Sequence, residues 1–137
     1  MIIRSISGVR GTAPEFTSES ISRYAQAFNA LQPKGVFMIG RDTRPSGEGF
    51  IEDIAQALIS VGRDVINLNI VPTPTVQFMV ENTDAVGGIV VTASHNPTEW
   101  NGLKFIREDG TFLLPDECDK LFTLVDGDIS VDAQYIG

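Results

Sequence analysis

Apolar residues recur at intervals of three and four positions in three segments of the chain, the spacing that places side chains on one face of an α-helix. These segments are residues 17–35, 50–61 and 115–125. In the first, Thr17 is a candidate N-cap residue, and Pro33 and Gly35 end the pattern; Gly62 ends the second. Residues 71–82 predict a turn followed by a fourth, short helix.

Between the helical segments lie short runs that are apolar throughout or rich in β-branched residues, which indicates strands. They cover residues 35–40, 64–70, 85–94 and 102–106. Residues 111–115 are an expected partner of the last run, across a hairpin turn at 107–110. Because strands and helices alternate, the sequence predicts an α/β fold: a three-layer α/β/α sandwich with a mixed, mainly parallel sheet.

Polar or turn-forming residues follow three of the expected strands. Arg41 comes directly after the first, Pro72 and Pro74 follow the second, and Ser94 ends the third. Ligands of open α/β sheets bind beyond the carboxyl ends of the strands. We therefore expect these three strand ends to form one rim.

The composition is that of an ordinary globular domain, with 42% hydrophobic and 20% charged residues among 137. We expect one domain over residues 1–137, of which about 126–137 are a polar linker or tail toward a second domain. The net charge of -8 argues against nucleic acid and anionic membranes as partners. Cys118 and His95 are alone of their types, so neither an internal disulfide nor a common zinc site is expected.

The first residues lack the apolar region of a signal peptide, and no run approaches the roughly 20 apolar residues of a membrane span. We expect a cytoplasmic protein. Several basic residues nevertheless lie in or beside segments rich in Gly, Thr, Pro or Asn, where loops are expected. They are Arg4, Arg10, Arg41, Arg44 and Lys104. An acidic chain with this distribution can still hold a local anion site.

The segment TASHNP, residues 92–97, places Ser94 beside His95 directly after an apolar run. Such a serine can be a nucleophile, part of a phosphate cradle, or an ordinary turn residue. Serine hydrolysis is disfavoured, because the Gly-x-Ser-x-Gly elbow is missing and no acid of a catalytic triad is identifiable.

Phosphoryl transfer needs a hydroxyl, cationic and backbone donors around it, a proton acceptor and usually a divalent metal. Arg10 between two glycines, Lys104, His95 and Asn96 supply all of these except the metal ligands. Alternation in the 102–106 strand places Lys104 opposite its apolar neighbours, toward either solvent or the phosphate.

Each of these features also has a structural interpretation. Asp42 can pair with an arginine and cap the next helix, and the prolines after residue 71 can merely redirect the chain. An exposed histidine such as His95 usually has no special role.

Several segments occur together and in order in this chain: SGVRG, GRDTR, VPTP, GGIVVTASHNP and NGLKF, followed by a DG turn. This set resembles the first domain of the α-D-phosphohexomutases, the phosphoglucomutase and phosphomannomutase superfamily, and covers essentially the whole chain. TASHNP resembles the phosphoserine signature of that family and is the strongest single signal.

The resemblance implies that phosphorylated Ser94 gives its phosphoryl group to a hexose phosphate, forming a bisphosphate that returns the other phosphoryl group to the serine. Arg10 would bind and polarise the phosphoryl group, His95 would support it, and Lys104 would assist proton transfer. The candidate residues for shaping the loop and binding substrate or phosphate are Arg41, Asn96 and Asn101.

The family also implies Mg²⁺, which Ser94 would meet through a phosphoryl oxygen, and a hexose 1,6-bisphosphate activator. The other metal ligands belong to a DGDxDR-like loop in a second domain. Asp126-Gly127-Asp128 resembles part of that loop, but it comes too early and Ile129 and Ser130 follow it, so we expect a turn there.

The expected partners are a hexose phosphate and the remaining domains of a longer parent chain, without which the domain is expected to be inactive. Two alternatives stay open: a non-catalytic module that binds a phosphosugar or phosphate, and a domain kept for protein contact. The motif TAS, in place of an Ile-Ser-Ala variant, slightly favours glucose or mannose phosphates over glucosamine phosphate.

Overall fold

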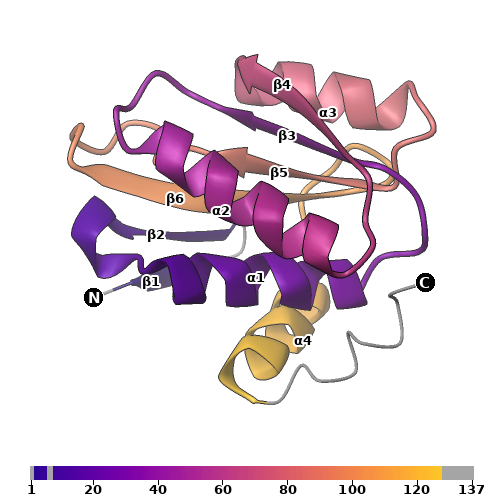
Figure 1. Ribbon diagram of the computed structural model, residues 1–137, viewed down its shortest axis with the longest axis horizontal. Helices are drawn as coiled ribbons and strands as arrows, with labels where there is room; N and C mark the ends of the chain where they lie inside the picture. Colours follow the sequence, from indigo (N-terminus) through magenta and orange to yellow (C-terminus); the bar gives the residue numbers. More distant parts are fainter. Residues whose placement is uncertain (1, 6–7, 128–137) are drawn as a thin grey trace.

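The computed structural model describes residues 2–5 and 8–127, which form six strands and four α-helices (Figure 1). The strands are β1 (Ile3–Ser5), β2 (Gly8–Thr12), β3 (Phe37–Arg41), β4 (Val65–Ile70), β5 (Gly87–Val91) and β6 (Trp100–Arg107). The helices are the short 3-10 helix η1 (Ala13–Glu15) and α1 (Ser18–Ala30), α2 (Gly47–Ser60), α3 (Thr73–Glu81) and α4 (Pro115–Asp126).

All six strands belong to one sheet in the order β1-β2-β6-β5-β3-β4. β3 is parallel to β4 and to β5, and the other neighbouring pairs are antiparallel, so β2, β3, β4 and β5 run in one direction and β1 and β6 in the other. Helices α1 and α2 cover one face, α4 packs beside α1, and α3 covers the other face (Figure 1). The predicted three-layer sandwich with a mixed sheet is confirmed.

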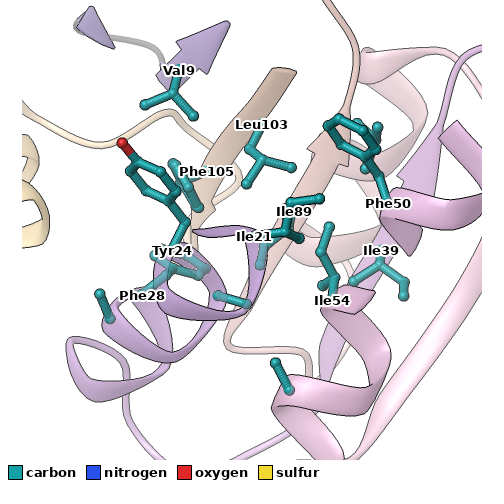
Figure 2. Packing of buried hydrophobic residues seen from close by; sticks show 14 of the residues in the cluster. Val9, Ile21, Tyr24, Phe28, Ile39, Phe50, Ile54, Ile89, Leu103 and Phe105 are labelled. Carbon is teal, nitrogen blue, oxygen red and sulfur yellow. The ribbon is translucent and has the colours of Figure 1, made fainter. Parts of the chain in front are cut away.

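β5 is apolar throughout, and β3 is apolar up to its last residue, because both faces of these strands are buried. On the side of α1 and α2, the ring of Phe28 lies 5.2 Å from the rings of both Phe37 and Phe105, and Figure 2 shows how Phe28 and Phe105 pack with their neighbours. On the opposite side, Val76 of α3 packs in a smaller cluster that includes Met38 of β3. Phe37 and Met38 are adjacent in sequence and point to opposite faces of the sheet, as strand alternation requires.

Most of the predicted elements are present, with different bounds. α1 begins after Thr17, whose hydroxyl accepts a hydrogen bond from the Ser20 amide, as expected of an N-cap. α2 begins at Gly47, earlier than the apolar pattern predicts, because the Gly47 amide already bonds to the carbonyl of Arg44.

The prediction of a strand at residues 111–115, paired with β6 across the turn at 107–110, is wrong. The turn itself forms, with Gly110 at φ 85° and the Arg107 amide donating to the Thr111 carbonyl. Beyond it, a single bridge joins Ile106 to Phe112, and the chain then enters α4 at Pro115. Proline lacks the amide that a ladder would need and fits the first turn of a helix, so it ends the pairing.

The N-terminal hairpin of β1 and β2 was not predicted, since its glycines read as loop signals. β2 is held by antiparallel pairing with β6, a partner distant in the sequence, so the local pattern does not predict it. The loops expected at Arg4 and Arg10 are therefore strands, β1 and β2. Arg41 is the last residue of β3, and Lys104 lies on β6, where the 102–106 strand was predicted.

Residue 126, from about which a linker or tail was expected, still belongs to a helix. Asp126 is the last residue of α4, and its carboxylate accepts two hydrogen bonds from the Arg4 guanidinium, at 2.6 and 2.8 Å. Residues 128–137 lie outside the described part of the chain. Within the described residues, no helix is long and apolar enough to cross a membrane.

Candidate functional site

Three strand ends meet at one rim of the sheet, as the sequence predicts. The Val71 amide donates to the Arg41 carbonyl, and the Asp42 amide donates to the Val91 carbonyl, which joins the ends of β4, β3 and β5. Beside them lies an open hollow of about 460 Å³. It is lined by Asp42, Val71, Pro72, Thr73, Pro74, Val90, Thr92, Ser94, His95 and Lys104.

Ser94 is an exposed residue at the corner after β5, with φ at 54°. This left-handed conformation costs a residue with a side chain about 1–2 kcal/mol, so the surrounding structure must hold it. The Ser94 amide donates to the hydroxyl of Thr92 at 3.0 Å, and Ser94 Oγ accepts from Lys104 Nζ at 2.9 Å. The corner thus presents a hydroxyl to solvent with an ammonium group against it.

Lys104 reaches Ser94 because β6 pairs with β5 and places Lys104 opposite Val90. Partial burial lowers the pKa of Lys104, and the positive charge of Arg10 lowers it further. The ammonium also lies 5.5 Å from the centre of the Phe112 ring. A lysine whose pKa is lowered exchanges a proton more readily near neutral pH, which suits it to proton transfer at Ser94 Oγ.

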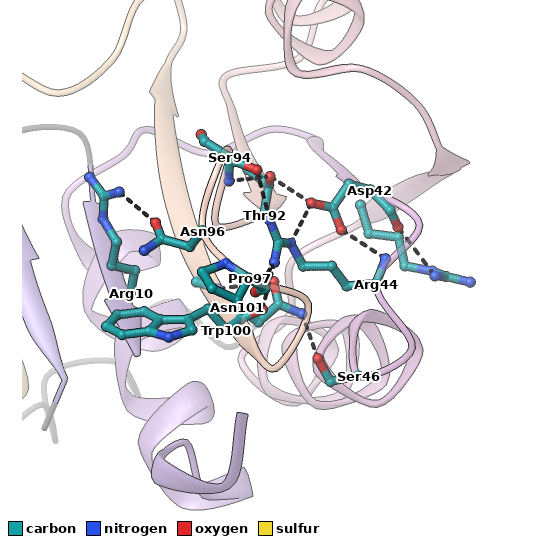
Figure 3. Close-up of polar contacts among 12 residues, drawn as sticks. Arg10, Asp42, Arg44, Ser46, Thr92, Ser94, Asn96, Pro97, Trp100 and Asn101 are labelled. Atoms are coloured by element: carbon teal, nitrogen blue, oxygen red, sulfur yellow. Dashed lines mark hydrogen bonds and ion pairs between the residues drawn. The ribbon is translucent and has the colours of Figure 1, made fainter. Parts of the chain in front are cut away.

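Arg10 stands on β2, on the other side of Ser94. Its Nη1 donates to Asn96 Oδ1 at 2.9 Å, so the residue after His95 holds the guanidinium in place (Figure 3). Arg10, Ser94 and Lys104 also line a second, smaller hollow. β2 can pair with β6 at this point because Gly102 of β6 has no side chain. A Cβ there would lie 2.2 Å from the Val9 carbonyl oxygen.

Arg44 organises the loop that carries Ser94. Its side chain is only 9% exposed, and its guanidinium donates to the main-chain carbonyls of Ser94, Pro97 and Trp100 at 2.7, 2.6 and 3.1 Å (Figure 3). Its Nε donates to Asp42 Oδ2 at 2.9 Å. The predicted pair of Asp42 with an arginine is confirmed.

The predicted capping of α2 by Asp42 is wrong. The N-cap of α2 is Ser46, and Asp42 instead accepts from the Arg44 amide and from the hydroxyl of Thr92. The contacts of Arg44 with residues 94–100 were missed in the sequence, because they join positions 50 to 56 residues apart. The sequence contains one indication of a structural role for Arg44, which is that it stands two positions after Asp42.

The structure brings together Ser94, His95 and Lys104 around the larger hollow, with Arg10 beside them. Asn96 contacts Arg10, and the remaining two candidates, Arg41 and Asn101, lie elsewhere. Arg41 lines neither of these hollows, and its Nη1 donates to the Asp42 carbonyl at 3.3 Å.

Asn101 is fully buried and donates to Ser46 Oγ at 2.8 Å. Its place fits the expectation that it shapes the loop. It does not line the hollows around Ser94.

Within the described residues, no group of three or more His, Cys, Asp or Glu side chains could hold a metal ion. Both oxygens of Asp42 are already hydrogen-bonded. The carboxylate of Asp126 is bound by Arg4, and Asp128 lies outside the described residues.

Relatives of this chain carry the names phosphoglucosamine mutase and phosphoglucomutase/phosphomannomutase. It is 40% identical over 128 residues to "Phosphoglucosamine mutase" of Shouchella clausii, covering 88% of this chain and 28% of that protein. It is 41% identical over 109 residues to "Phosphoglucomutase/phosphomannomutase" of Thermococcus kodakarensis, covering 75% of this chain and 24% of that protein. Phosphoglucosamine mutases among the relatives leave the expected preference against the glucosamine branch without support.

Solved structures agree. A crystal structure of a putative phosphomannomutase from Thermus thermophilus superposes with a TM-score of 0.79 at 32% identity, covering 90% of this chain and 30% of that one. This chain thus spans about a quarter to a third of the length of these proteins. A profile described as "Phosphoglucomutase/phosphomannomutase, alpha/beta/alpha domain I" matches residues 2–130, and the chain therefore belongs to this family as its α/β/α domain I.

Proposed function

We propose that this chain is the phosphoserine-bearing first domain of a mutase that interconverts hexose 1-phosphate and hexose 6-phosphate through a bisphosphate. The observation that carries the proposal is the contact between Lys104 Nζ and Ser94 Oγ at 2.9 Å, on an exposed corner with Arg10 beside it. A hydroxyl held against one cation and near another suits a group that carries a phosphoryl anion.

In the transfer step, the bond between the phosphorus atom and Ser94 Oγ breaks while a hydroxyl oxygen of the hexose phosphate bonds to the same phosphorus. Lys104 Nζ already donates to Ser94 Oγ, so it is placed to protonate the leaving oxygen. The sugar hydroxyl loses its proton in the same step, and this proton goes to the Lys104 amine, which thereby ends the step as the ammonium group that it was at the start. The reverse step runs through the same contacts. Phosphoryl transfer of this kind depends mainly on positioning and charge stabilisation.

The other candidate residues then have distinct roles. Arg10, oriented by Asn96, binds the phosphoryl oxygens, and His95 at the wall of the larger hollow supports the group as it moves. Asn101 shapes the loop from beneath through Ser46. Arg41 is assigned to a more distant phosphate of the substrate, since it stands at the same rim but outside the hollows beside Ser94.

Mg²⁺, when bound, neutralises charge on the transferring phosphoryl group. The ligands available to Mg²⁺ around Ser94 would be oxygens of the phosphoryl group on that serine. The nearby carboxylate of Asp42 already accepts hydrogen bonds at both of its oxygens. We propose that the remaining ligands of Mg²⁺ come from another domain of a longer parent, that a hexose 1,6-bisphosphate primes Ser94, and that the enzyme works in the cytoplasm. The domain 1–137 alone is then expected to lack mutase turnover.

The test is intact-mass analysis with peptide mapping before and after incubation with glucose 1,6-bisphosphate and Mg²⁺. We expect one added phosphoryl group on Ser94, no addition in Ser94→Ala, and normal addition in Ser60→Ala, whose serine lies at the far end of α2. Steady binding of the bisphosphate without any phosphorylation of Ser94 would favour the non-catalytic binding module. Appreciable mutase turnover by the chain alone would contradict the expected dependence on other domains.

A further inference from the structure

The backbone at Ser94 is held from both sides by one connected set of side chains. On the amino side, the Ser94 amide donates to Thr92 Oγ1, and that hydroxyl donates to Asp42 Oδ2 at 2.7 Å. On the carboxyl side, the Ser94 carbonyl accepts from Arg44 Nη2, and Arg44 Nε donates to the same Asp42 oxygen. Asp42 therefore links the two peptide groups that flank Ser94.

We propose that Arg44, through this link with Asp42 and Thr92, is a positioning residue that keeps Ser94 in its left-handed conformation and so aims Oγ at Lys104. The inference rests on the proposed role of Ser94 as the phosphoryl carrier. It assigns to Arg44 no contact with the substrate.

The geometry excludes Arg44 as a ligand of the phosphate. A guanidinium has five N–H donors, and hydrogen bonds to Asp42, Pro97, Trp100 and Ser94 leave at most one over. The side chain is also 9% exposed and lines neither hollow beside Ser94. Its charge acts on the loop carbonyls and on Asp42, beneath the surface that a substrate would touch.

The partners of Arg44 are spaced along the loop in a way that fixes its curvature. The carbonyls of Ser94, Pro97 and Trp100 are three positions apart, and all converge on one planar group. A lysine in place of Arg44 keeps the charge near Asp42 but cannot reach three carbonyls in a plane. With those bonds gone, the strain at Ser94 favours return to an ordinary backbone conformation.

The decisive variant is Arg44→Lys, with Arg63→Lys as the matched control. Arg63 is another buried arginine, 6% exposed, that donates to main-chain carbonyls, but it lies at the opposite end of the sheet. Thr92→Val is a second, milder variant, because it removes only the hydroxyl link and keeps the side-chain shape. It guards against the case in which Arg44→Lys does not fold.

Three readouts separate positioning from general stability: NMR chemical shifts of Ser94, amide hydrogen exchange of residues 94–100, and the phosphorylation rate of Ser94 by glucose 1,6-bisphosphate. We expect Arg44→Lys to shift the Ser94 signals and speed loop exchange about tenfold or more, the effect of losing one charge-assisted bond. At saturating bisphosphate the rate should fall by a similar factor, while the half-saturating concentration changes less than about twofold. Thr92→Val should act in the same direction and more weakly.

Arg63→Lys should leave all three loop readouts at their wild-type values even where it lowers the midpoint of unfolding. The proposal is overturned if Arg44→Lys, or Thr92→Val when the former is unfolded, leaves the Ser94 shifts and loop exchange as they are in Arg63→Lys. If wild-type Ser94 is never phosphorylated, the proposed function fails in this chain. The shifts and exchange rates still decide whether Arg44 holds the loop.

Discussion

The two ends of the parallel strands each contain a buried arginine, and the two arginines are used differently. At the amino ends, Arg63 donates to Asn29 and to the carbonyls of Pro33 and Gly35, and its guanidinium lies 4.0 Å from the centre of the Phe37 ring. At the carboxyl ends, Arg44 binds main-chain carbonyls and pairs with the carboxylate of Asp42.

What differs between the ends is the backbone that each arginine holds. The Arg63 end ties a turn to the core, and none of the described residues that line the hollow beside it carries a hydroxyl. The Arg44 end holds a residue of positive φ whose hydroxyl is exposed and contacts Lys104. A buried arginine that binds main-chain carbonyls therefore stabilises an ordinary turn at one end of the sheet. At the other end it stabilises a strained, exposed corner, and strained backbone of this kind is concentrated at functional sites.

The largest expected effect comes from Gly102→Ala, at the end of the sheet that holds Ser94. This change should disrupt the pairing of β2 with β6. The new Cβ would lie 2.2 Å from the Val9 carbonyl oxygen, so β2, and Arg10 with it, must move. We expect a loss of about 3 kcal/mol or more in the free energy of unfolding, measured by urea titration. The control is Gly49→Ala in α2, where nothing lies within 4 Å of the added atom and stability should rise slightly.

Arg63→Met tests the far end. Removing the guanidinium leaves the side-chain and main-chain oxygens of buried Asn29, and the carbonyls of Pro33 and Gly35, without their donor, which should lower the free energy of unfolding by about 3 kcal/mol. Arg107→Met, which breaks ion pairs with Asp109 and Glu117 that are partly exposed, should cost less, about 1 kcal/mol. Altered NMR signals at Ser94 in Arg63→Met would erase the distinction between the two ends.

Arg10→Met sharpens the electrostatic side of the comparison. Burial is the main cause of the lowered pKa of Lys104, and the Arg10 charge adds to it, so this change should raise that pKa toward its ordinary value. A titration of the lysine side-chain NMR signals measures the shift, with Arg23→Met as a control far from Ser94. An unmoved or lower pKa of Lys104 would remove Arg10 as a cause.

The lowered pKa of Lys104 also predicts the sign of a pH effect on stability. The unfolded chain binds this proton more tightly than the folded chain. The contribution of Lys104 to folding stability therefore rises as the pH increases from the folded pKa to the unfolded one. Urea unfolding across the alkaline range, compared between wild type and Lys104→Met, measures the difference.

The smallest effect is expected at the exposed pair of Arg4 and Asp126. The hydrogen bond from Arg4 holds the pKa of the Asp126 carboxyl below its ordinary value. Asp126→Asn should cost less than about 1 kcal/mol at neutral pH, since the carboxylate is 63% exposed. This stability is present above the unfolded pKa and is lost as the pH falls through the lowered folded pKa, so the two unfolding curves should converge in acid.

The fold could be predicted wherever the local pattern matches the tertiary environment. The buried runs of β3 and β5 and the amphipathic faces of α1 and α4 read correctly, because burial itself imposes those patterns. β2 could not be predicted, since two of its five residues are glycines and its stability comes from pairing with β6. The strand predicted at residues 111–115 does not form, because the chain makes a single bridge at Phe112 and then enters α4.

The candidate site shows the same division. Ser94, His95 and Lys104 were found because strand ends and strand alternation fix where they stand. The reach of Arg44 to Ser94 and beyond depends on how the loop after β3 lies against the loop after β5, which no local pattern encodes. Asn101 was named as a residue that shapes the loop, but its burial on β6 and its bond to Ser46 could not be predicted from the sequence.

Arg44 binds its loop through carbonyl oxygens alone, and this has a consequence for engineering. Carbonyl groups are common to every amino acid, so the scaffold does not depend on which side chains stand at His95, Thr98 or Glu99, all of which are exposed. These three exposed positions can be randomised as a library while the curvature of the loop is kept. The domain thereby separates the part that sets the shape of the loop from the part that can be rewritten for a new ligand.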